Sequence, residues 1–403
     1  MEKEARLGGA DFMRAVACLM VLAHHLVLRM DFSYLPDALA LPLILARFGN
    51  YGVSVFFVLS GFLLSRPFWL ALDRGLPPPS LTIYTMRRAA RILPGFWVAL
   101  TVGFILSFTV YDFPLDGELA GRYVAGFFLM SQWHWRTLFP VQGDGPLWSI
   151  PFETTCYVLL PIAFLLLFTP ALRSRAALPA RILWLGVISL ALLGHWLIVT
   201  HIPIDTVERG WQYGFQGGAK EWMPRYNPVG FFAVFAIGAL AAGIQTMIPR
   251  KRSPVYDVVA ILAMIVGVAE IWMSVGDSWE GYGWLGIPYR FPVIPLTVAV
   301  ALCVLPQSAV LARVLDNRLS HYIATVSFGV YIWQDIVLML MKKLFPWSFG
   351  TGSDDVLGGW FTSSLVATLI IFAIGTLSYI LLERPVMRWA RAREKAPHQA
   401  VPA

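Results

Sequence analysis

The sequence predicts an all-α polytopic membrane protein with about ten transmembrane helices, on three observations. Hydrophobic residues make up 58% of the 403 residues, whereas Asp, Glu, Lys and Arg make up only 14%, about half the charged fraction of a soluble domain. Aromatic residues are abundant, with 27 Phe, 16 Trp and 14 Tyr. Apolar runs of about 20 residues, the length that crosses a bilayer, recur along the chain. This composition excludes a soluble enzyme and an intrinsically disordered protein.

Ten apolar runs are predicted to span the membrane. A shorter stretch, 119–131, contains Arg122 and is expected to be re-entrant or to lie on the membrane surface. We expect one transmembrane domain over residues 1–385 and a basic cytoplasmic tail over 386–403 that is disordered at its end, with no internal repeat and no soluble domain. The predicted spans cover roughly residues 11–29, 50–70, 91–111, 152–169, 182–200, 228–247, 254–274, 289–306, 321–341 and 360–382.

The distribution of Lys and Arg predicts the orientation. If the N-terminus lies in the cytoplasm, most of the 31 basic residues fall in cytoplasmic segments, as the positive-inside rule requires. Ten spans then return the basic C-terminal tail to the same side. We therefore expect a multi-pass protein of the cytoplasmic membrane with both termini inside. The net charge of +7 follows from this topology and indicates no nucleic-acid partner.

Cysteine and aromatic residues complete this general description. Cys18, Cys156 and Cys303 all lie in apolar stretches and are expected to be buried thiols, with neither a disulfide framework nor a metal-binding spacing. No metal is expected. The predicted outer loops, 201–227 and 275–290, are rich in Trp and Tyr. They fit an interfacial aromatic belt or a platform for a sugar or polyketide acceptor, and the sequence leaves both open.

The first predicted span carries ionisable side chains, which are expensive within a membrane and mark function by default. Arg14 and His25 are 11 residues apart, so they share a helical face to within ~20° and are separated by about 16 Å along the axis. Asp11 lies three residues before Arg14 and can pair with it. His24 points about 100° away from His25. A lone His is more often a packing residue, but the face shared with Arg14 favours His25 as functional.

Two further polar motifs lie at the ends of the third and fourth spans. Arg88 and Arg91, with i, i+3 spacing, are either topological anchors or an anion clamp, because guanidinium groups bind phosphates bidentately. Ser149 is expected to cap the fourth span. Glu153, one turn later, either interacts with the helix dipole or serves as a working acid or base.

These motifs, taken in order, resemble those of the acyltransferase 3 family of integral membrane O-acyltransferases. The similarity covers nearly the whole chain, and the ordered set is far more specific than any one motif. It rests on Arg14 followed by His25, Phe56-Phe-Val-Leu-Ser60-Gly61-Phe62, Arg88-Ala-Ala-Arg91, Trp148-Ser149 with Glu153, Ser327-Phe-Gly329-Val-Tyr331-Ile-Trp333, and Glu383-Arg384-Pro385.

The resemblance implies transfer of an acyl group, commonly acetyl, from cytoplasmic acyl-CoA to a hydroxyl of a glycan, lipid or small natural product. It implies a catalytic role for His25 and Arg14 with Glu153 as a required acid, and donor binding by Arg88 and Arg91. The residues it associates with substrate binding are Trp148, Ser149, Tyr331 and Trp333. Acyl transfer needs a base for the hydroxyl or a nucleophile that carries the acyl group, and His25 suits either role.

One departure and one alternative qualify this interpretation. The family often has His after the late Tyr-x-Trp, where this chain has Gln334 and Asp335, so any role of that His is absent or altered here. Members with a fused extracellular hydrolase-like domain use it for the final transfer, whereas here acylation is expected at the membrane domain itself. The alternative functions are a multi-span transporter or flippase, against which the lack of a repeat counts, and a non-catalytic protein of this fold.

Overall fold

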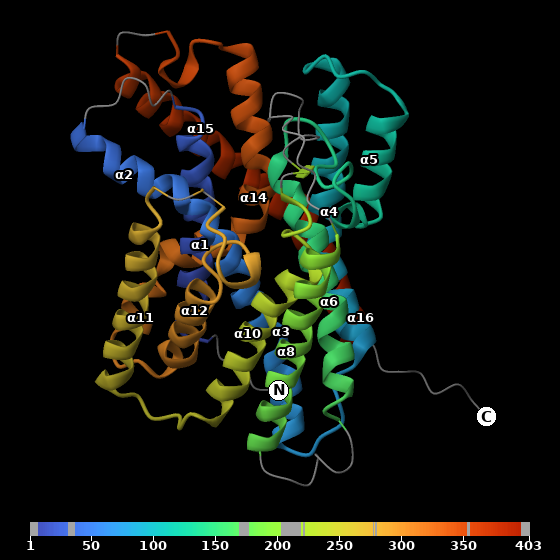
Figure 1. The fold of residues 1–403 in the computed structure, drawn as a ribbon, viewed down its shortest axis with the longest axis vertical. Helices are drawn as coiled ribbons and strands as arrows, with labels where there is room; N and C mark the ends of the chain where they lie inside the picture. The colour runs from blue at the N-terminus through green and yellow to red at the C-terminus, as the bar shows by residue number, and fades with distance from the viewer. Residues whose placement is uncertain are drawn as a thin grey trace.

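The protein is a bundle of helices in the computed structural model (Figure 1). The described part contains nine helices that are long and apolar enough to cross a membrane, together with a shorter apolar helix over 293–307, and no β-sheet. The predicted fold class is therefore confirmed. The structure describes residues 7–30, 37–168, 177–202, 219–220, 222–276, 278, 280–352 and 355–395.

The long helices follow the predicted order, and polar residues cap several of them. The side chains of Ser80, Asn227, Ser253 and Asn317 accept hydrogen bonds from first-turn N–H groups, which have no partner within the helix itself. The long helices are α1 (Ala10–Val27), α3 (Gly52–Asp73), α4 (Leu81–Thr109), α6 (Ser149–Leu165), α8 (Ala177–His201), α10 (Pro228–Met247), α11 (Pro254–Met273), α14 (Arg318–Leu344) and α15 (Val356–Ser378).

The shorter helices are α2 (Asp37–Arg47), α5 (Gly117–Phe127), α12 (Val293–Val304), α13 (Leu311–Leu315) and α16 (Arg384–Lys395). Helix α12 is shorter than the predicted span at 289–306 because residues 280–292 form a folded loop. In that loop the N–H of Gly283 donates to the carbonyl of Ile287 (2.8 Å) and that of Trp284 donates to Phe291 (2.7 Å). Apolar composition alone does not distinguish such a packed loop from the first turn of a span.

Helix α5 occupies most of the stretch that was predicted to be re-entrant or surface-lying. Its Arg122 is only 2% exposed, and Nε donates to the carbonyl of Phe139 at 2.9 Å. Burial lowers the pKa of Arg122 to about 10. The charged residue that interrupts this apolar stretch thus fixes α5 to the loop that follows it.

Two helices lie at the centre of the bundle and others at its rim. In the spanning windows of α10 and α14, 78% and 72% of the residues are buried, against 22% in α8 and 17% in α11. The central α10 packs closely against α3. A Cβ placed on Gly61 would lie 2.0 Å from the carbonyl oxygen of Phe235 in α10, and one on Gly238 would lie 2.0 Å from that of Val58. Small residues allow such backbone contact between membrane helices.

Three aromatic residues of the predicted outer loops form a packed cluster. Trp222, Tyr226 and Tyr289 are at most 5% exposed, and the rings of Trp222 and Tyr226 stack at 4.3 Å between centroids. These three side chains therefore form neither the expected belt nor an exposed platform, whereas Trp284 is 58% exposed. Trp211, Tyr213 and Trp279 lie outside the described residues.

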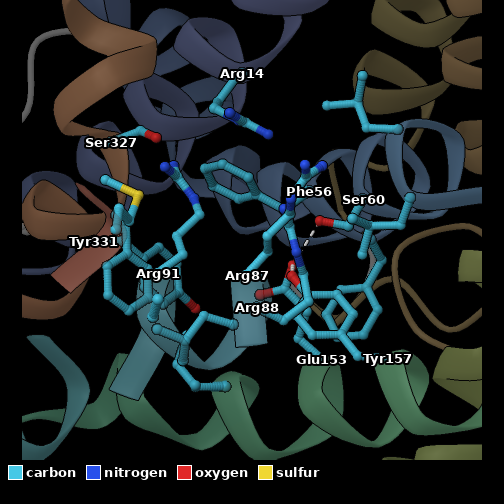
Figure 2. A pocket seen from close by; sticks show the side chains of 18 of the residues that line it. Arg14, Phe56, Ser60, Arg87, Arg88, Arg91, Glu153, Tyr157, Ser327 and Tyr331 are labelled. Atoms are coloured by element: carbon cyan, nitrogen blue, oxygen red, sulfur yellow. Dashed lines mark hydrogen bonds between the residues drawn. The ribbon is translucent and has the colours of Figure 1, made fainter. Parts of the chain in front are cut away.

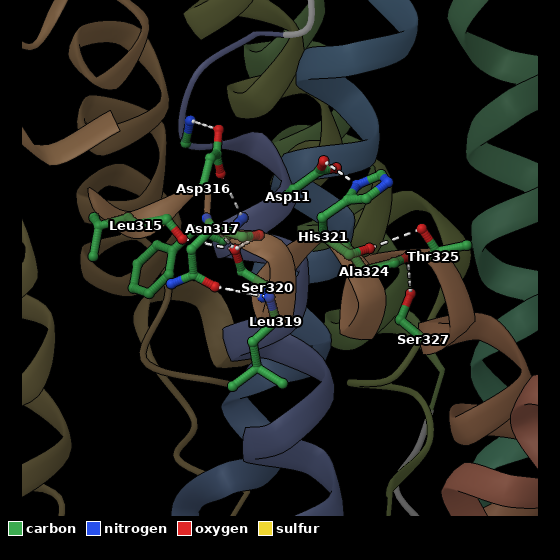
Figure 3. A network of polar contacts seen from close by, with 12 residues as sticks. Asp11, Leu315, Asp316, Asn317, Leu319, Ser320, His321, Ala324, Thr325 and Ser327 are labelled. Carbon is green, nitrogen blue, oxygen red and sulfur yellow. Dashed lines mark hydrogen bonds and ion pairs between the residues drawn. The ribbon is translucent and has the colours of Figure 1, made fainter. Parts of the chain in front are cut away.

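The start of α1 is fixed to the start of α14 (Figure 3). The carboxylate of Asp316 accepts hydrogen bonds from the N–H groups of Gly9 (2.6 Å) and Phe12 (3.0 Å). Asp11 contacts Nδ1 of His321 at 2.9 Å, so it pairs with α14 instead of with Arg14 as expected. This arrangement holds the first turns of α1 in place and leaves Arg14 to face another side.

The chain after α15 continues as a helix. A π-helical turn, Tyr379–Glu383, joins α15 to α16, and α16 packs against α4. Residues 386–395 of the predicted tail are therefore helical, and 396–403 lie outside the described residues. All three cysteines are buried free thiols, as predicted.

Candidate active site

A cavity of about 620 Å³ lies among α1, α3, α4, α6, α14 and α16, near the end of the bundle at which α4 begins (Figure 2). Side chains from both the first and the last described helices reach it, so distant parts of the sequence form one wall. Six residues that the sequence analysis singled out line it: Arg14, Arg88, Arg91, Ser149, Glu153 and Tyr331.

Five arginines line this cavity, and three of them lie away from its solvent-exposed edge. Arg14, Arg88 and Arg91 are all partly buried, and within the described ranges no carboxylate forms an ion pair with any of them. Burying a charge without a partner is costly. Guanidinium groups bind phosphate and carboxylate through paired hydrogen bonds, so the cavity has the chemistry of an anion-binding site.

Glu153 faces the same cavity and is held by two hydroxyl groups. Its Oε1 accepts from Ser60 Oγ of α3 at 2.6 Å and from the Tyr157 hydroxyl at 2.5 Å (Figure 2). The sequence analysis assigned no role to Ser60 or Tyr157. The i, i+4 spacing of Glu153 and Tyr157 could have predicted their contact, whereas the contact with Ser60 depends on how α3 and α6 pack.

Ser149 and Tyr331 form the side of the cavity where α6 begins. Ser149 Oγ lies 2.7 Å from the Tyr331 hydroxyl, and the Tyr331 ring meets that of Phe56 edge-on, with 5.9 Å between centroids. Ser149 is the first residue of α6 and not its cap, which is Trp148. A short helical turn, Gly145–Trp148, precedes α6 and displaces the cap by one residue, so the expected capping role of Ser149 is wrong.

His25 lies outside the lining of this cavity. Its Nδ1 is 2.8 Å from the carbonyl oxygen of Val21. Since a carbonyl only accepts hydrogen bonds, Nδ1 carries the hydrogen and Nε2 keeps its lone pair. Arg29, one turn after His25, pairs with Asp335, which lies one turn after Tyr331 on α14. Asp11 likewise contacts His321 at the start of both helices, so α1 and α14 run in the same direction and His25 lies at about the same level along the bundle as Tyr331.

Four residues that interact through Asp335 form a second polar group, which we call the outer cluster: His25, Arg29, Asp144 and Asp335. The second carboxylate oxygen of Asp335 accepts from the N–H of Gly145 at 3.0 Å. Asp144 is fully buried, and neither of its carboxylate oxygens has a hydrogen-bond partner in the part of the chain that the structure describes. Burial, and to a lesser extent the charge of Asp335, raises the pKa of Asp144 well above its usual range.

The other singled-out residues lie in different surroundings. Trp148 packs edge-on against Trp222 and Tyr226 at 5.4 Å and does not line the cavity, and Trp333 does not line it either. Nδ1 of His24 bonds to the carbonyl of Arg47, which ties α1 to α2. Within the described ranges, no three His, Cys, Asp or Glu side chains gather as metal ligands would.

Comparison with known proteins identifies the family. The model of an acyltransferase domain matches residues 7–383, which is nearly the whole chain. The chain belongs to the acyltransferase 3 family. The motifs that resemble this family come from five separate spans, and residues from each of them line the one cavity.

Several curated relatives are similar to this chain over most of its length. It is 24% identical over 392 residues to the peptidoglycan O-acetyltransferase OatA of Listeria monocytogenes, covering 94% of this chain and 55% of that protein. It is 28% identical over 414 residues to the acyltransferase MdmB of Streptomyces mycarofaciens (95% and 92%). It is 26% identical over 362 residues to the exopolysaccharide production protein ExoZ of Rhizobium meliloti (86% and 92%). The chain spans about half the length of the first curated relatives it matches.

Proposed function

We propose that this protein transfers an acyl group, acetyl in the first instance, from cytoplasmic acyl-CoA to a hydroxyl of a carbohydrate at the outer side of the membrane. The names of two relatives, a peptidoglycan O-acetyltransferase and an exopolysaccharide production protein, support a carbohydrate over a lipid or a small natural product. Family membership supports acyl transfer over the alternative of a transporter or flippase. The basic end of the bundle is then the cytoplasmic end, with both termini inside.

The observation that carries the proposal is the set of three arginines without a carboxylate partner. Arg14, Arg88 and Arg91 converge with Glu153 on a cavity at the end of the bundle where α4 begins. Coenzyme A carries several phosphate charges, which three guanidinium groups would neutralise. With the nucleotide part in this cavity, the pantetheine arm would extend past Tyr331 and bring the thioester towards His25.

The reaction itself is assigned to His25. Nε2, which keeps its lone pair, removes the proton from the acceptor hydroxyl, and the hydroxyl oxygen attacks the thioester carbonyl carbon. The C–S bond then breaks, an ester forms, and the CoA thiolate takes the proton that His25 holds. Asp335 and Glu153 do not enter these steps directly. The carboxylate of Asp335 favours the imidazolium that forms on proton transfer, and Glu153 positions Ser60 and Tyr157 at the donor site.

The test is acetyl-CoA turnover by the purified protein in detergent, followed by release of the free thiol in the presence of carbohydrate acceptors. Arg88→Lys and Arg91→Lys keep the charge but lose the planar fork, so each should raise the KM for acetyl-CoA about 10-fold or more. Arg250→Lys, an exposed position on a loop at the same end, is the control and should behave as the parent protein.

Two results would contradict the proposal. If neither acetyl-CoA nor a longer acyl-CoA is bound by the folded protein, the donor is a different compound. If both Lys variants bind acetyl-CoA as the parent protein does, these arginines are topological anchors only. Thermal melting of each variant excludes loss of fold as the cause.

A further inference from the structure

The last described helix forms part of the cavity wall. Met387, Ala390, Arg391 and Glu394 of α16 all line the cavity. Their spacing of three, one and three residues puts them on one helical face, which is the face turned towards α4. Resemblance to the family singled out residues up to Pro385, so it assigned no role to this helix.

Arg87 and Glu394 join α4 to α16 across the opening of the cavity. Nε of Arg87 donates to Oε1 of Glu394 at 2.7 Å, and its second terminal nitrogen donates to Oε2 at 2.8 Å. This is the parallel, two-bond geometry with which arginine also binds a phosphate. The Arg87 side chain is 53% exposed and that of Glu394 is 14% exposed, so an anion in solution can reach the guanidinium group of Arg87. An anion that offers two oxygens in the same geometry can replace Glu394 there.

The balance of charge around the cavity favours such a replacement. Five arginines line it (Arg14, Arg87, Arg88, Arg91 and Arg391), against two carboxylates, Glu153 and Glu394. Glu153 is held by Ser60 and Tyr157. Glu394 is thus the carboxylate that neutralises the arginines at the opening, where Arg87 and Arg391 are the more solvent-exposed members of the set.

We propose that Arg87 and Arg391 form a subsite for a phosphate monoester at the opening of the cavity, and that Glu394 occupies it until the donor displaces it. This inference rests on the proposed function. With the thioester directed towards His25, the opposite end of the donor lies at the opening, and in coenzyme A that end carries the 3′-phosphate of the ribose. Glu394 then competes with the donor for the two arginines. A dianionic phosphate monoester displaces the Glu394 carboxylate, whereas a donor without the monoester does not.

The test compares the binding of coenzyme A and 3′-dephospho-coenzyme A to the full chain in detergent by isothermal titration calorimetry. Glu394→Gln should bind coenzyme A several-fold more tightly, with a smaller gain for the dephospho form. Arg391→Gln should bind coenzyme A about 10-fold more weakly, since one charge-assisted bond is lost, and should discriminate less between the two ligands. Arg388→Gln, an exposed position on the same helix outside the lining, should change neither value.

The outcomes separate this inference from the function on which it rests. If the parent protein binds coenzyme A but does not prefer it to the dephospho form, the subsite is wrong and the donor site stands. The same holds if Glu394→Gln and Arg391→Gln both leave the preference unchanged. If the parent protein binds neither ligand, both proposals fail.

Discussion

His24 and His25 are neighbours in the sequence but have different surroundings. The ring of His24 is 4% exposed and bonds to the backbone of Arg47, whereas His25 lies in the outer cluster with Nε2 available as a base. We expect His25→Ala to lower acyl transfer about 10²–10⁴-fold, the usual cost of losing a general base, with an unchanged melting temperature. His24→Ala should lower the melting temperature and leave the turnover of the folded fraction nearly intact.

Acyl transfer and thermal melting of the two purified variants check this assignment. An active His25→Ala, or a folded but inactive His24→Ala, would show that the wrong histidine has been chosen. Arg14→Ala removes an arginine of the cavity and should weaken donor binding. This variant therefore distinguishes the cavity from the outer cluster that contains His25.

Asp144 gives a prediction about pH. Its pKa is raised by burial and by Asp335, so the folded protein holds the proton more tightly than the unfolded chain, in which the pKa is about 3.9. The contribution of this group is therefore fully present below about pH 4 and is lost as the pH rises towards the folded pKa. Asp144→Asn, neutral at every pH, should melt at a higher temperature than the parent protein at pH 8, with the difference shrinking towards pH 5.

Melting curves between pH 5 and pH 9 measure this effect. Gly186→Ala is the control, since it changes no titratable group and nothing lies within 4 Å of the new methyl group, and its curve should run parallel to that of the parent protein. A parallel curve for Asp144→Asn as well would mean that Asp144 is ionised in the folded protein.

The sequence singled out several of the residues that line the candidate cavity, and packing between helices brought in others. The sequence singled out Arg14, Arg88 and Glu153 because a charge within an apolar run is visible without a structure. It missed Ser60, which was part of a quoted motif but had no role until α3 was placed against α6. It also missed Arg391, because a basic tail has the same composition whether it lies in solvent or against a cavity.

At the scale of the helices, the contact between α3 and α10 leaves no room for a side chain at Gly61. We expect Gly61→Ala to destabilise the protein by about 1–3 kcal/mol or more, the range for overpacked interiors, because its new methyl group would meet the backbone carbonyl of Phe235. Gly186→Ala in α8, where nothing lies within 4 Å of the new atom, should be neutral or slightly stabilising.

Thermal melting in detergent compares the two glycine variants. Equal melting temperatures would show that α3 and α10 separate easily, and the motif glycine would then need another explanation.

The positions of the long helices could be predicted from the hydropathy of the sequence. Nine of the ten predicted runs correspond to long helices, because a run of about 20 apolar residues has few alternatives in a bilayer. The run at 289–306 is shortened by its folded loop. The tail is helical from Arg384 to Lys395 although its composition is that of a polar segment, because α4 offers it a surface on which to pack.

For the whole molecule, the proposed orientation can be measured directly. An enzyme that is active only outside the cytoplasm, such as alkaline phosphatase, should give no activity when it is fused after Lys395, because α16 is proposed to lie in the cytoplasm with the donor cavity. A fusion in the loop after α4, at Asp112, should be active. Activity at Lys395 would place the arginine cavity on the outer face, where no acyl-CoA is available.

Helix α1 and helix α16 both line one cavity, although more than 350 residues separate them. Chains are synthesised from the N-terminus at about 5–20 residues per second, so Arg14 is inserted well before Arg391 exists. The ribosome must pass residue 394 before the cavity is closed. A nascent or prematurely terminated chain would hold most of its spans in the bilayer and still lack the wall of the cavity that α16 supplies.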